Sequence, residues 1–153
     1  VTKDSVLLAI ENVLAMLGTK QMLGGQVDDI NWHEEKENPD YIKDIYLKKT
    51  SALICASLQA GALLSHANQK QILALKNYGE NIGLAFQITD DLIDLQQDKK
   101  DDEKPTYPTI FGIKEAQEEV KRCCQQAKEY MMIFGDKAQL FYELADFIPN
   151  REK

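Results

Sequence analysis

Apolar residues recur at intervals of three and four along most of the chain, which is the spacing of amphipathic helices. The first such stretch covers residues 5–23, and a polar segment over 31–40 separates it from a second stretch over 41–67. Pro39 and Asp40 are typical of a helix start. The later half of the second stretch is small and apolar on nearly all sides, which predicts a helix buried among others.

The helical pattern continues through the rest of the chain. Asn68 can cap a helix over 69–97, and a charged segment closed by two prolines follows over 98–108. The pattern then returns over 113–134, where opposite charges stand near i,i+4 spacing.

The last predicted helix is bounded by turn residues. Gly135 ends the preceding helix, Asp136 is a candidate N-cap, and Pro149 marks the end of the last helix. The chain has no strand-like alternation and no internal repeat. The sequence therefore predicts an all-α, antiparallel helical bundle that forms a single domain over 1–153.

Composition and charge narrow the classes of function that fit this chain. The 153 residues are 44% hydrophobic and 28% charged, as in a globular domain with a real core. A net charge of −7 argues against a nucleic-acid partner. Cys55, Cys123 and Cys124 lack metal-ligand spacing and predict free thiols in a reducing compartment, which favours the cytoplasm. No apolar run reaches the roughly 18–20 residues that span a bilayer, and no leader opens the chain, which begins at Val1.

The segment "GLAFQITDDLIDLQQD" carries the clearest chemistry. On a helix, Gln87, Asp90, Asp91 and Asp94 share one face, where three carboxylates would repel one another. A bound Mg²⁺ removes that repulsion, because this ion prefers clustered hard oxygen ligands. The alternative is a solvated acidic face, although the preceding "GLAFQI" is apolar and points the face toward something buried.

Two further segments offer weaker signals. "GGQVDDI" (24–30) contains adjacent glycines that form a plain turn or let a backbone or ligand come close, followed by Gln26 and Asp29. "KKTSAL" (48–53) places two lysines and a hydroxyl in a helix that enters the core, where a lysine can meet an anion or simply reach solvent.

Four segments in this order resemble the trans-type polyprenyl diphosphate synthases, the family of farnesyl and geranylgeranyl diphosphate synthases. "GGQVDDI" is similar to the family's GGQxxDL segment, and "YLKKTSAL" to its KT segment. "GENIGLAFQITDDLID" resembles the second aspartate-rich motif FQxxDDxxD, and "EKPTYPTIFG" resembles GKxTYPxLxG. These segments span roughly residues 24–112.

The resemblance implies the isoprenoid synthase fold, in which helices surround a central cavity. It also implies a Mg²⁺-dependent prenyltransferase of isoprenoid biosynthesis that condenses isopentenyl diphosphate with an allylic diphosphate. Family members are typically homodimers. Their magnesium ions neutralise the departing diphosphate, so that an allylic cation forms and the double bond of isopentenyl diphosphate attacks it.

Roles for single residues follow from the resemblance alone. Asp90, Asp91 and Asp94 would be the metal side, with Asp90 as the foremost direct ligand. Lys49 and Gln87 would face the diphosphate and the early cation, and Thr50 would help to stabilise positive charge. The remaining substrate-binding candidates are Phe86 at the cavity wall, Lys104 as a loop lysine that closes over the diphosphate, and Gln26.

The chain also departs from the family pattern. The first aspartate-rich motif, a DDxxD followed by paired arginines, is absent, and the segment after Asp94 lacks the usual GKxxGxD stretch. We therefore expect the C-terminal portion of a synthase that is incomplete alone. The alternatives are a chain that acts with another chain supplying DDxxD, and a non-catalytic helical subunit that pairs with a synthase. A terpene cyclase would ionise the same class of diphosphate, but the KT and GGQ segments argue against it.

Overall fold

The computed structural model describes residues 1–31, 39–96 and 105–151, and all regular structure in these ranges is helical. The long α5 forms the middle of the molecule. The elements follow one another as α1 (Lys3–Leu17), α2 (Met22–Ile30), α3 (Pro39–Tyr46), the π-helical turn η2 (Leu47–Ser51), α4 (Ala52–Leu64), α5 (Gln69–Gln96), α6 (Tyr107–Phe111), α7 (Ile113–Met131), the 3-10 helix η3 (Met132–Ala138), α8 (Gln139–Phe147) and the 3-10 turn η4 (Ile148–Asn150).

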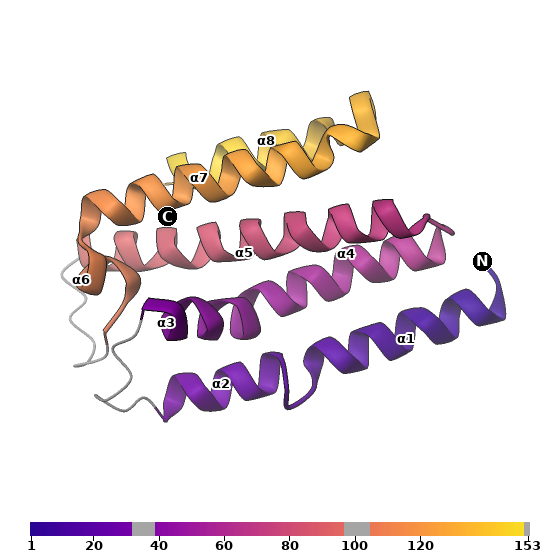
Figure 1. The fold of residues 1–153 in the computed structure, drawn as a ribbon, viewed down its shortest axis with the longest axis horizontal. Helices are drawn as coiled ribbons and strands as arrows, with labels where there is room; N and C mark the ends of the chain where they lie inside the picture. The colour runs from indigo at the N-terminus through magenta and orange to yellow at the C-terminus, as the bar shows by residue number, and fades with distance from the viewer. Residues whose placement is uncertain (32–38, 97–104, 152–153) are drawn as a thin grey trace.

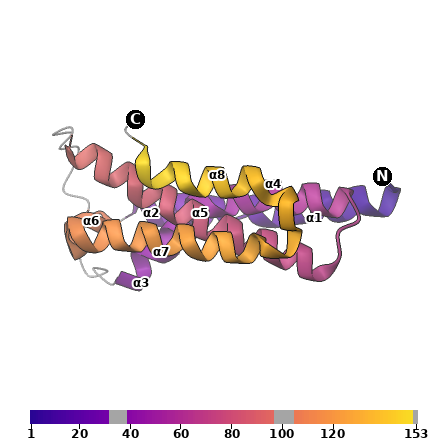
Figure 2. The same cartoon turned by 90° about the horizontal axis from the view of Figure 1, so that it is seen from above.

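The helices form an antiparallel bundle. In Figure 1 the row of α1 and α2 lies along one edge, followed by the row of α3, η2 and α4, then α5, then α7. Figure 2 shows α8 returning beside α7. Contacts join α1 to α4, α4 to α5 and α5 to α7. The predicted all-α bundle is confirmed.

The first predicted helix is divided, and the break does not fall where the glycine pair suggested a turn. Residues 18–21 separate α1 from α2, whereas Gly24 and Gly25 lie inside α2. A Cβ on Gly25 would lie 2.6 Å from the Cβ of Lys48 and 2.6 Å from the backbone nitrogen of Lys49. The plain-turn expectation is wrong, because Gly25 instead allows α2 to cross η2 closely.

The later boundaries agree in part with the predictions. Asn68 caps α5 as expected: its Oδ1 accepts from the Gln71 amide at 3.0 Å, and Gln71 Oε1 accepts from the Asn68 amide at 2.9 Å. The Asp136 cap is wrong, because the 3-10 helix η3 fills the turn around Gly135 and α8 begins at Gln139. The expected segment over 98–108 overlaps the start of the unpredicted α6, which begins at Tyr107, and its first seven positions lie outside the described residues.

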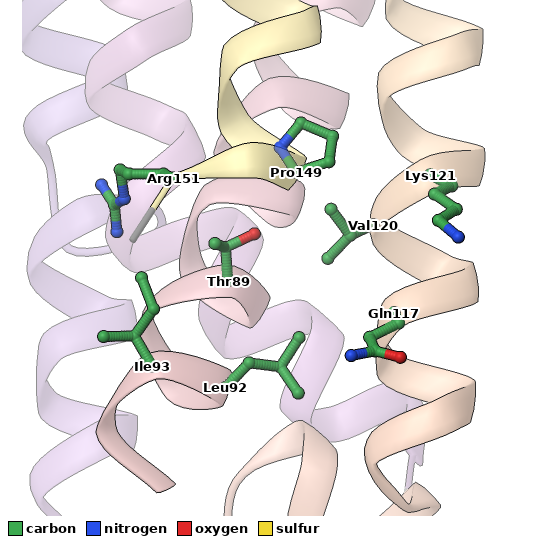
Figure 3. A pocket seen from close by; sticks show the side chains of 8 residues that line it. All are labelled: Thr89, Leu92, Ile93, Gln117, Val120, Lys121, Pro149 and Arg151. Atoms are coloured by element: carbon green, nitrogen blue, oxygen red, sulfur yellow. The ribbon is translucent and has the colours of Figure 1, made fainter. Parts of the chain in front are cut away.

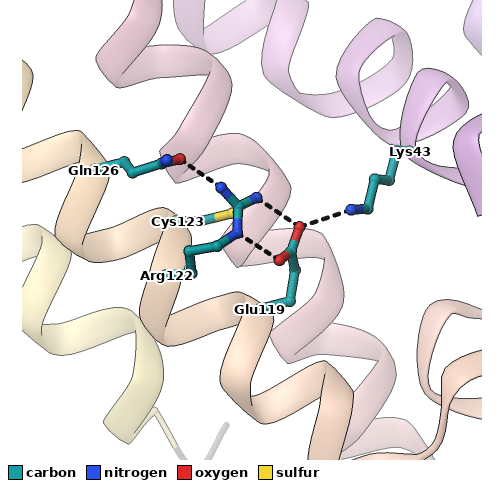
Figure 4. A network of polar contacts seen from close by, with 5 residues as sticks. All are labelled: Lys43, Glu119, Arg122, Cys123 and Gln126. Atoms are coloured by element: carbon teal, nitrogen blue, oxygen red, sulfur yellow. Dashed lines mark hydrogen bonds and ion pairs between the residues drawn. The ribbon is translucent and has the colours of Figure 1, made fainter.

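The core lies between α3, α5, α7 and α8. Its largest fully buried side chains include Tyr78, Ile42, Ile88 and Met131. The face of Glu119 toward α3 is polar: Figure 4 shows its carboxylate between Lys43 and Arg122. Burial of the apolar side chains is the main term that stabilises this arrangement.

The α1–α2 row is apolar on its outer side. Leu7, Leu8, Ile10 and Leu14 are each more than half exposed, although α1 packs on α4. By length and mean hydropathy alone, Lys3–Ile30 is long and apolar enough to cross a membrane, a property that core helices of soluble proteins and signal sequences share. The sequence analysis counted only uninterrupted apolar runs, and so it missed the high mean hydropathy of α1 and α2 taken together.

Candidate functional site

The KT segment and the aspartate-rich segment face each other across η2 and α5. Ser51 is buried, and its hydroxyl donates to the Glu80 carbonyl at 3.2 Å. A Cβ on Gly83 would lie 2.3 Å from Ser51 Oγ, so glycine allows α5 to approach η2 at this point. The π-helical turn shifts the register of the side chains between α3 and α4, and such turns are frequent at functional sites.

Hydrogen bonds connect these two elements. The Thr50 hydroxyl donates to Gln87 Oε1 at 2.9 Å, and Gln87 Nε2 donates to Asp91 Oδ1 at 3.3 Å. The Tyr46 hydroxyl donates to Asp91 Oδ2 and accepts from the Tyr107 backbone amide at 3.1 Å. The structure therefore brings together Thr50, Gln87 and Asp91, which the resemblance named, and adds Tyr46.

Tyr46 is a residue that the sequence analysis missed. It is buried, and this burial, with the negative charge and hydrogen bond of Asp91 in support, raises the pKa of its phenol well above its ordinary value. The phenol is therefore a hydrogen-bond donor at any physiological pH. Tyr46 is the first residue of the quoted segment "YLKKTSAL", but a tyrosine on an apolar helix face is typical of a core position.

A second polar contact joins α2 to η2. Lys49 Nζ lies 2.7 Å from Asp29 Oδ2, and the side chain of Asp29 is only 11% exposed. Lys48 pairs with Asp44 of α3, and its Nζ lies 3.5 Å from Oδ2 of Asp28 on α2. Both lysines therefore reach α2, and Lys49 makes the shorter contact, with the more buried of the two carboxylates.

Asp90 has a partner that no sequence pattern suggested. Arg151, at the C-terminal end of the described chain, forms an ion pair with Asp90 Oδ1. Its guanidinium carbon lies 4.2 Å from the centre of the Phe86 ring, a cation–π contact. The Arg151 side chain is 13% exposed, and its Nε is buried without a hydrogen-bond partner among the described residues.

Arg151 also borders a cavity. This cavity has a volume of about 510 Å³ and lies between α5, α7 and η4 (Figure 3). Its lining includes one hydroxyl-bearing side chain, Thr89, and the apolar side chains of Leu92 and Val120. The C-terminal residues thus cover one side of α5 next to the aspartates, an arrangement that sequence alone could not reveal because it depends on how α8 returns along α7.

The three aspartates of the motif have different surroundings. Asp90 is about one third exposed, Asp91 is half-buried, and Asp94 is exposed. Among the described residues, no group of three or more His, Cys, Asp or Glu side chains is gathered closely enough to hold a metal ion. The donor set nevertheless suits Mg²⁺, which takes only one or two protein carboxylates and fills its other positions with water and phosphate oxygens.

The other predicted substrate residues are placed unevenly. Phe86 is partly buried on α5 beside Arg151, whereas Gln26 is exposed on α2. Lys104 lies outside the described residues.

The cysteines have no place in this site. Cys55, Cys123 and Cys124 are buried, and they are unpaired, as predicted for free thiols. Burial raises the pKa of Cys55 and Cys123 to about 12 and that of Cys124 to about 11. These thiols therefore stay protonated and do not act as nucleophiles.

Comparisons with known proteins agree on one group of enzymes. The sequence model of the family described as polyprenyl synthetase matches residues 8–138. A geranylgeranyl diphosphate synthase of Cyanophora paradoxa is 33% identical over 99% of this chain and 54% of its own length. A dimethylallyltranstransferase of Fischerella ambigua is 35% identical over 99% of this chain and 47% of its own length.

A solved structure extends the match to the fold. An apo farnesyl/geranylfarnesyl diphosphate synthase (FPP/GFPP synthase) from Zymomonas mobilis superposes with a TM-score of 0.87 at 30% identity, covering 96% of this chain and 52% of that one. The chain therefore spans about half the length of the relatives that it matches.

Proposed function

Because the chain belongs to the polyprenyl synthetase family, we propose that it supplies one side of a Mg²⁺-dependent prenyltransferase site. The reaction would condense isopentenyl diphosphate with an allylic diphosphate to make a geranyl, farnesyl or geranylgeranyl chain. The observation that carries this proposal is the hydrogen-bonded link from Thr50 through Gln87 to Asp91, which joins the KT segment to the aspartate helix.

The aspartates of α5 would hold the metal ion. Asp90 and Asp94 stand one helical turn apart, and Asp91 lies between them in sequence. We propose Asp90 as the direct ligand, with Asp91 and Asp94 on the same metal side. Magnesium, when bound, neutralises the charge that develops on the departing diphosphate.

The residues of η2 and α5 would then handle charge around the substrates. The Lys49 ammonium would bind diphosphate oxygens, for which it must exchange its contact with Asp29. The oxygens of Thr50 and Gln87 would face the allylic cation, since both are hydrogen-bond acceptors positioned beside each other. Phe86 would form an apolar wall near isopentenyl diphosphate.

Two further residues complete the proposed substrate contacts. Gln26 is exposed on the helix that carries Asp29, so it can meet a ligand above η2. Lys104 would close over the diphosphate from the segment before α6. Both assignments rest on the resemblance to the family and on position in the sequence.

The first aspartate-rich motif must come from outside the 153 residues. We propose that it belongs to the remainder of the same synthase, because the second motif is complete here. A separate chain that supplies DDxxD, or a synthase that this chain merely accompanies, is the second candidate. The exposed apolar side of α1 supports contact with further protein. We propose that the synthase forms a homodimer and that it acts in the cytoplasm.

The test is to incubate the purified chain with Mg²⁺, isopentenyl diphosphate and a radiolabelled allylic diphosphate. We expect no elongation by the chain alone, and elongation once a protein segment that carries the first aspartate-rich motif is co-expressed. Turnover by the chain alone would overturn the half-site proposal. A cyclic product with release of pyrophosphate would indicate a terpene cyclase, and inertness in every combination would favour the non-catalytic subunit.

A further inference from the structure

Tyr46 lies at the end of α3, behind the proposed site. Its hydroxyl donates to Asp91 Oδ2 and accepts from the Tyr107 amide at 3.1 Å. We propose that Tyr46 is a positioning residue that fixes the Asp91 carboxylate and, through it, the direction of the Gln87 side-chain amide. The catalytic meaning of this role rests on the proposed function, whereas the positioning itself can be measured without it.

The donor and acceptor roles of the Tyr46 hydroxyl follow from its neighbours. A phenol has a single proton to donate. The Tyr107 amide can only donate, so it occupies the acceptor side of the hydroxyl and leaves the proton for Asp91. Tyr107 is the first residue of α6, where a helix offers its amide no partner of its own. Tyr46 therefore satisfies a buried amide and a carboxylate with one group.

The direction of the Gln87 amide follows from Asp91 in the same way. An ionised carboxylate only accepts hydrogen bonds, so the Nε2 side of Gln87 turns toward Asp91 at 3.3 Å. The Oε1 side is then left for the Thr50 hydroxyl at 2.9 Å. An Asp91 carboxylate free to turn away from Gln87 would no longer select one of the two amide orientations, and Gln87 could present Nε2 to the place where the proposed cation forms.

The resulting chain of hydrogen bonds crosses four elements. It runs from α6 through Tyr46 of α3 to α5, and from Gln87 to η2. Tyr46 is 6% exposed, so it acts through Asp91 and not by touching a substrate. Burial keeps its phenol protonated, which keeps the donor available. The chain also ties the start of α6 to the aspartate helix.

The first experiment compares Tyr46→Phe with Tyr78→Phe by NMR on the ¹⁵N-labelled chain. Tyr78 is a matched control, because it is also buried and its hydroxyl donates to the Phe141 carbonyl at 3.0 Å, within the core. We expect Tyr46→Phe to shift the Gln87 side-chain amide signals and to speed hydrogen exchange of the Tyr107 amide about tenfold, the loss of roughly one hydrogen bond. Tyr78→Phe should change neither.

A second variant tests the same connection from the other end. Asp91→Asn retains the shape of the side chain and removes its purely accepting character. We expect it to shift the Gln87 signals as Tyr46→Phe does, and the double variant to add little further shift, because both changes break one connection. Unmoved Gln87 signals in Tyr46→Phe, or fully additive shifts in the double variant, would overturn the positioning role.

A binding measurement then separates this inference from the proposed function. Calorimetry with Mg²⁺ and inorganic pyrophosphate should give about tenfold weaker binding to Tyr46→Phe than to Tyr78→Phe, again the scale of one hydrogen bond to a charged group. Equal binding to both variants, despite shifted Gln87 signals, would overturn the functional part of the inference. If the unmodified chain binds no magnesium pyrophosphate, the proposed function fails, while the NMR comparison still decides the role of Tyr46.

Discussion

Asp90 is held beside a positive charge even without a metal ion, because the Arg151 guanidinium pairs with it and stacks on Phe86. This contact prevents the carboxylates of α5 from standing together uncompensated. It also means that a cation arriving at Asp90 must share or displace Arg151. Substitution of Asp90 should therefore affect function, and it also leaves the Arg151 side chain, which is only 13% exposed, without its carboxylate partner.

We expect Asp90→Ala in the complete synthase to lower kcat by several powers of ten, because a lost metal ligand removes stabilisation from a charge-separated transition state. The fold should survive with a loss of about 1–3 kcal/mol in the free energy of unfolding, because the largely buried Arg151 loses its carboxylate partner. Steady-state kinetics and urea unfolding check the two expectations. Asp146→Ala is the matched control, since that carboxylate of α8 is 67% exposed and pairs with Lys128 of α7. Equal kinetics in both variants would remove Asp90 from the site.

At the scale of elements, the site depends on how closely η2 approaches α5. A Cβ on Gly83 would lie 2.3 Å from Ser51 Oγ and 2.6 Å from Ser51 Cα. We expect Gly83→Ala to destabilise the fold by about 1–3 kcal/mol, the typical cost of overpacking. It should also lengthen the contact between Thr50 and Gln87, which sits one turn further along α5.

Gly61 is the control for this change. It lies in α4, and a Cβ there would meet nothing within 4 Å. We expect Gly61→Ala to stabilise the chain by about 0.5–1 kcal/mol, the helix-propensity gain of alanine over glycine. Urea denaturation of the two variants should therefore give shifts of opposite sign. Shifts of the same sign would mean that the close approach at Gly83 has no energetic weight.

The ion-pair group of Glu119 joins α7 to α3 and gives a pH-dependent stability (Figure 4). Hydrogen bonds from Arg122 lower the pKa of Glu119 to about 2, with burial opposing and Lys43 supporting the shift. A lowered pKa in the folded state means that this stability is complete above the ordinary value of 4.5 and is lost as the pH falls toward 2.

Glu119→Gln should accordingly lower the free energy of unfolding by on the order of 2 kcal/mol at pH 7. The difference from the unmodified chain should shrink as the pH falls from 4.5 to 2. Urea titrations across this range measure it. Glu118→Gln, at the exposed neighbouring position, should show no such pH dependence. A difference that stays constant down to pH 2 would contradict the assigned role of the ion pairs.

The elements also show which features a sequence can predict. The helix over 69–97 and its Asn68 cap could be predicted, because both depend on local spacing and on hydrogen bonds between near neighbours. The role of Gly25 could not, because it depends on where α2 crosses η2. Arg151 is the extreme case, since its contact with Asp90 spans 61 positions and arises only when α8 folds back along α7.

The candidate site follows the same division. The shared face of Gln87 and Asp91 follows from helical periodicity, and the pairing of Gln87 with Thr50 follows only from the packing of η2 on α5. The different surroundings of Asp90, Asp91 and Asp94 could not be predicted from the sequence either. Periodicity places three carboxylates on one face, but Arg151 beside Asp90 and Tyr46 beside Asp91 come from different, distant elements.

At the scale of the whole molecule, the bundle has one side that is not covered. The α1–α2 row lies at the edge in Figure 1, and its outer face carries Leu7, Leu8, Ile10 and Leu14. Monomeric proteins rarely leave a contiguous apolar face of this kind in water. Large exposed apolar patches usually mark sites of contact with other proteins or with membranes. Since the chain spans about half of its relatives, further protein is available in those relatives to cover the equivalent face.

We therefore expect the isolated chain to self-associate through α1, because joining two such faces removes apolar surface from water at roughly 25 cal/mol per Å². Leu7 and Leu14 lie on one stripe of α1, at 55% and 65% exposure. The double variant Leu7→Glu, Leu14→Glu should sediment as a monomer at concentrations where the unmodified chain does not. Leu140→Glu on α8 is the control, because that leucine is 72% exposed on another side of the bundle and should leave association unchanged. If the double variant associates as strongly as the unmodified chain, another surface makes the contact, and the covering of α1 by further synthase protein loses its support.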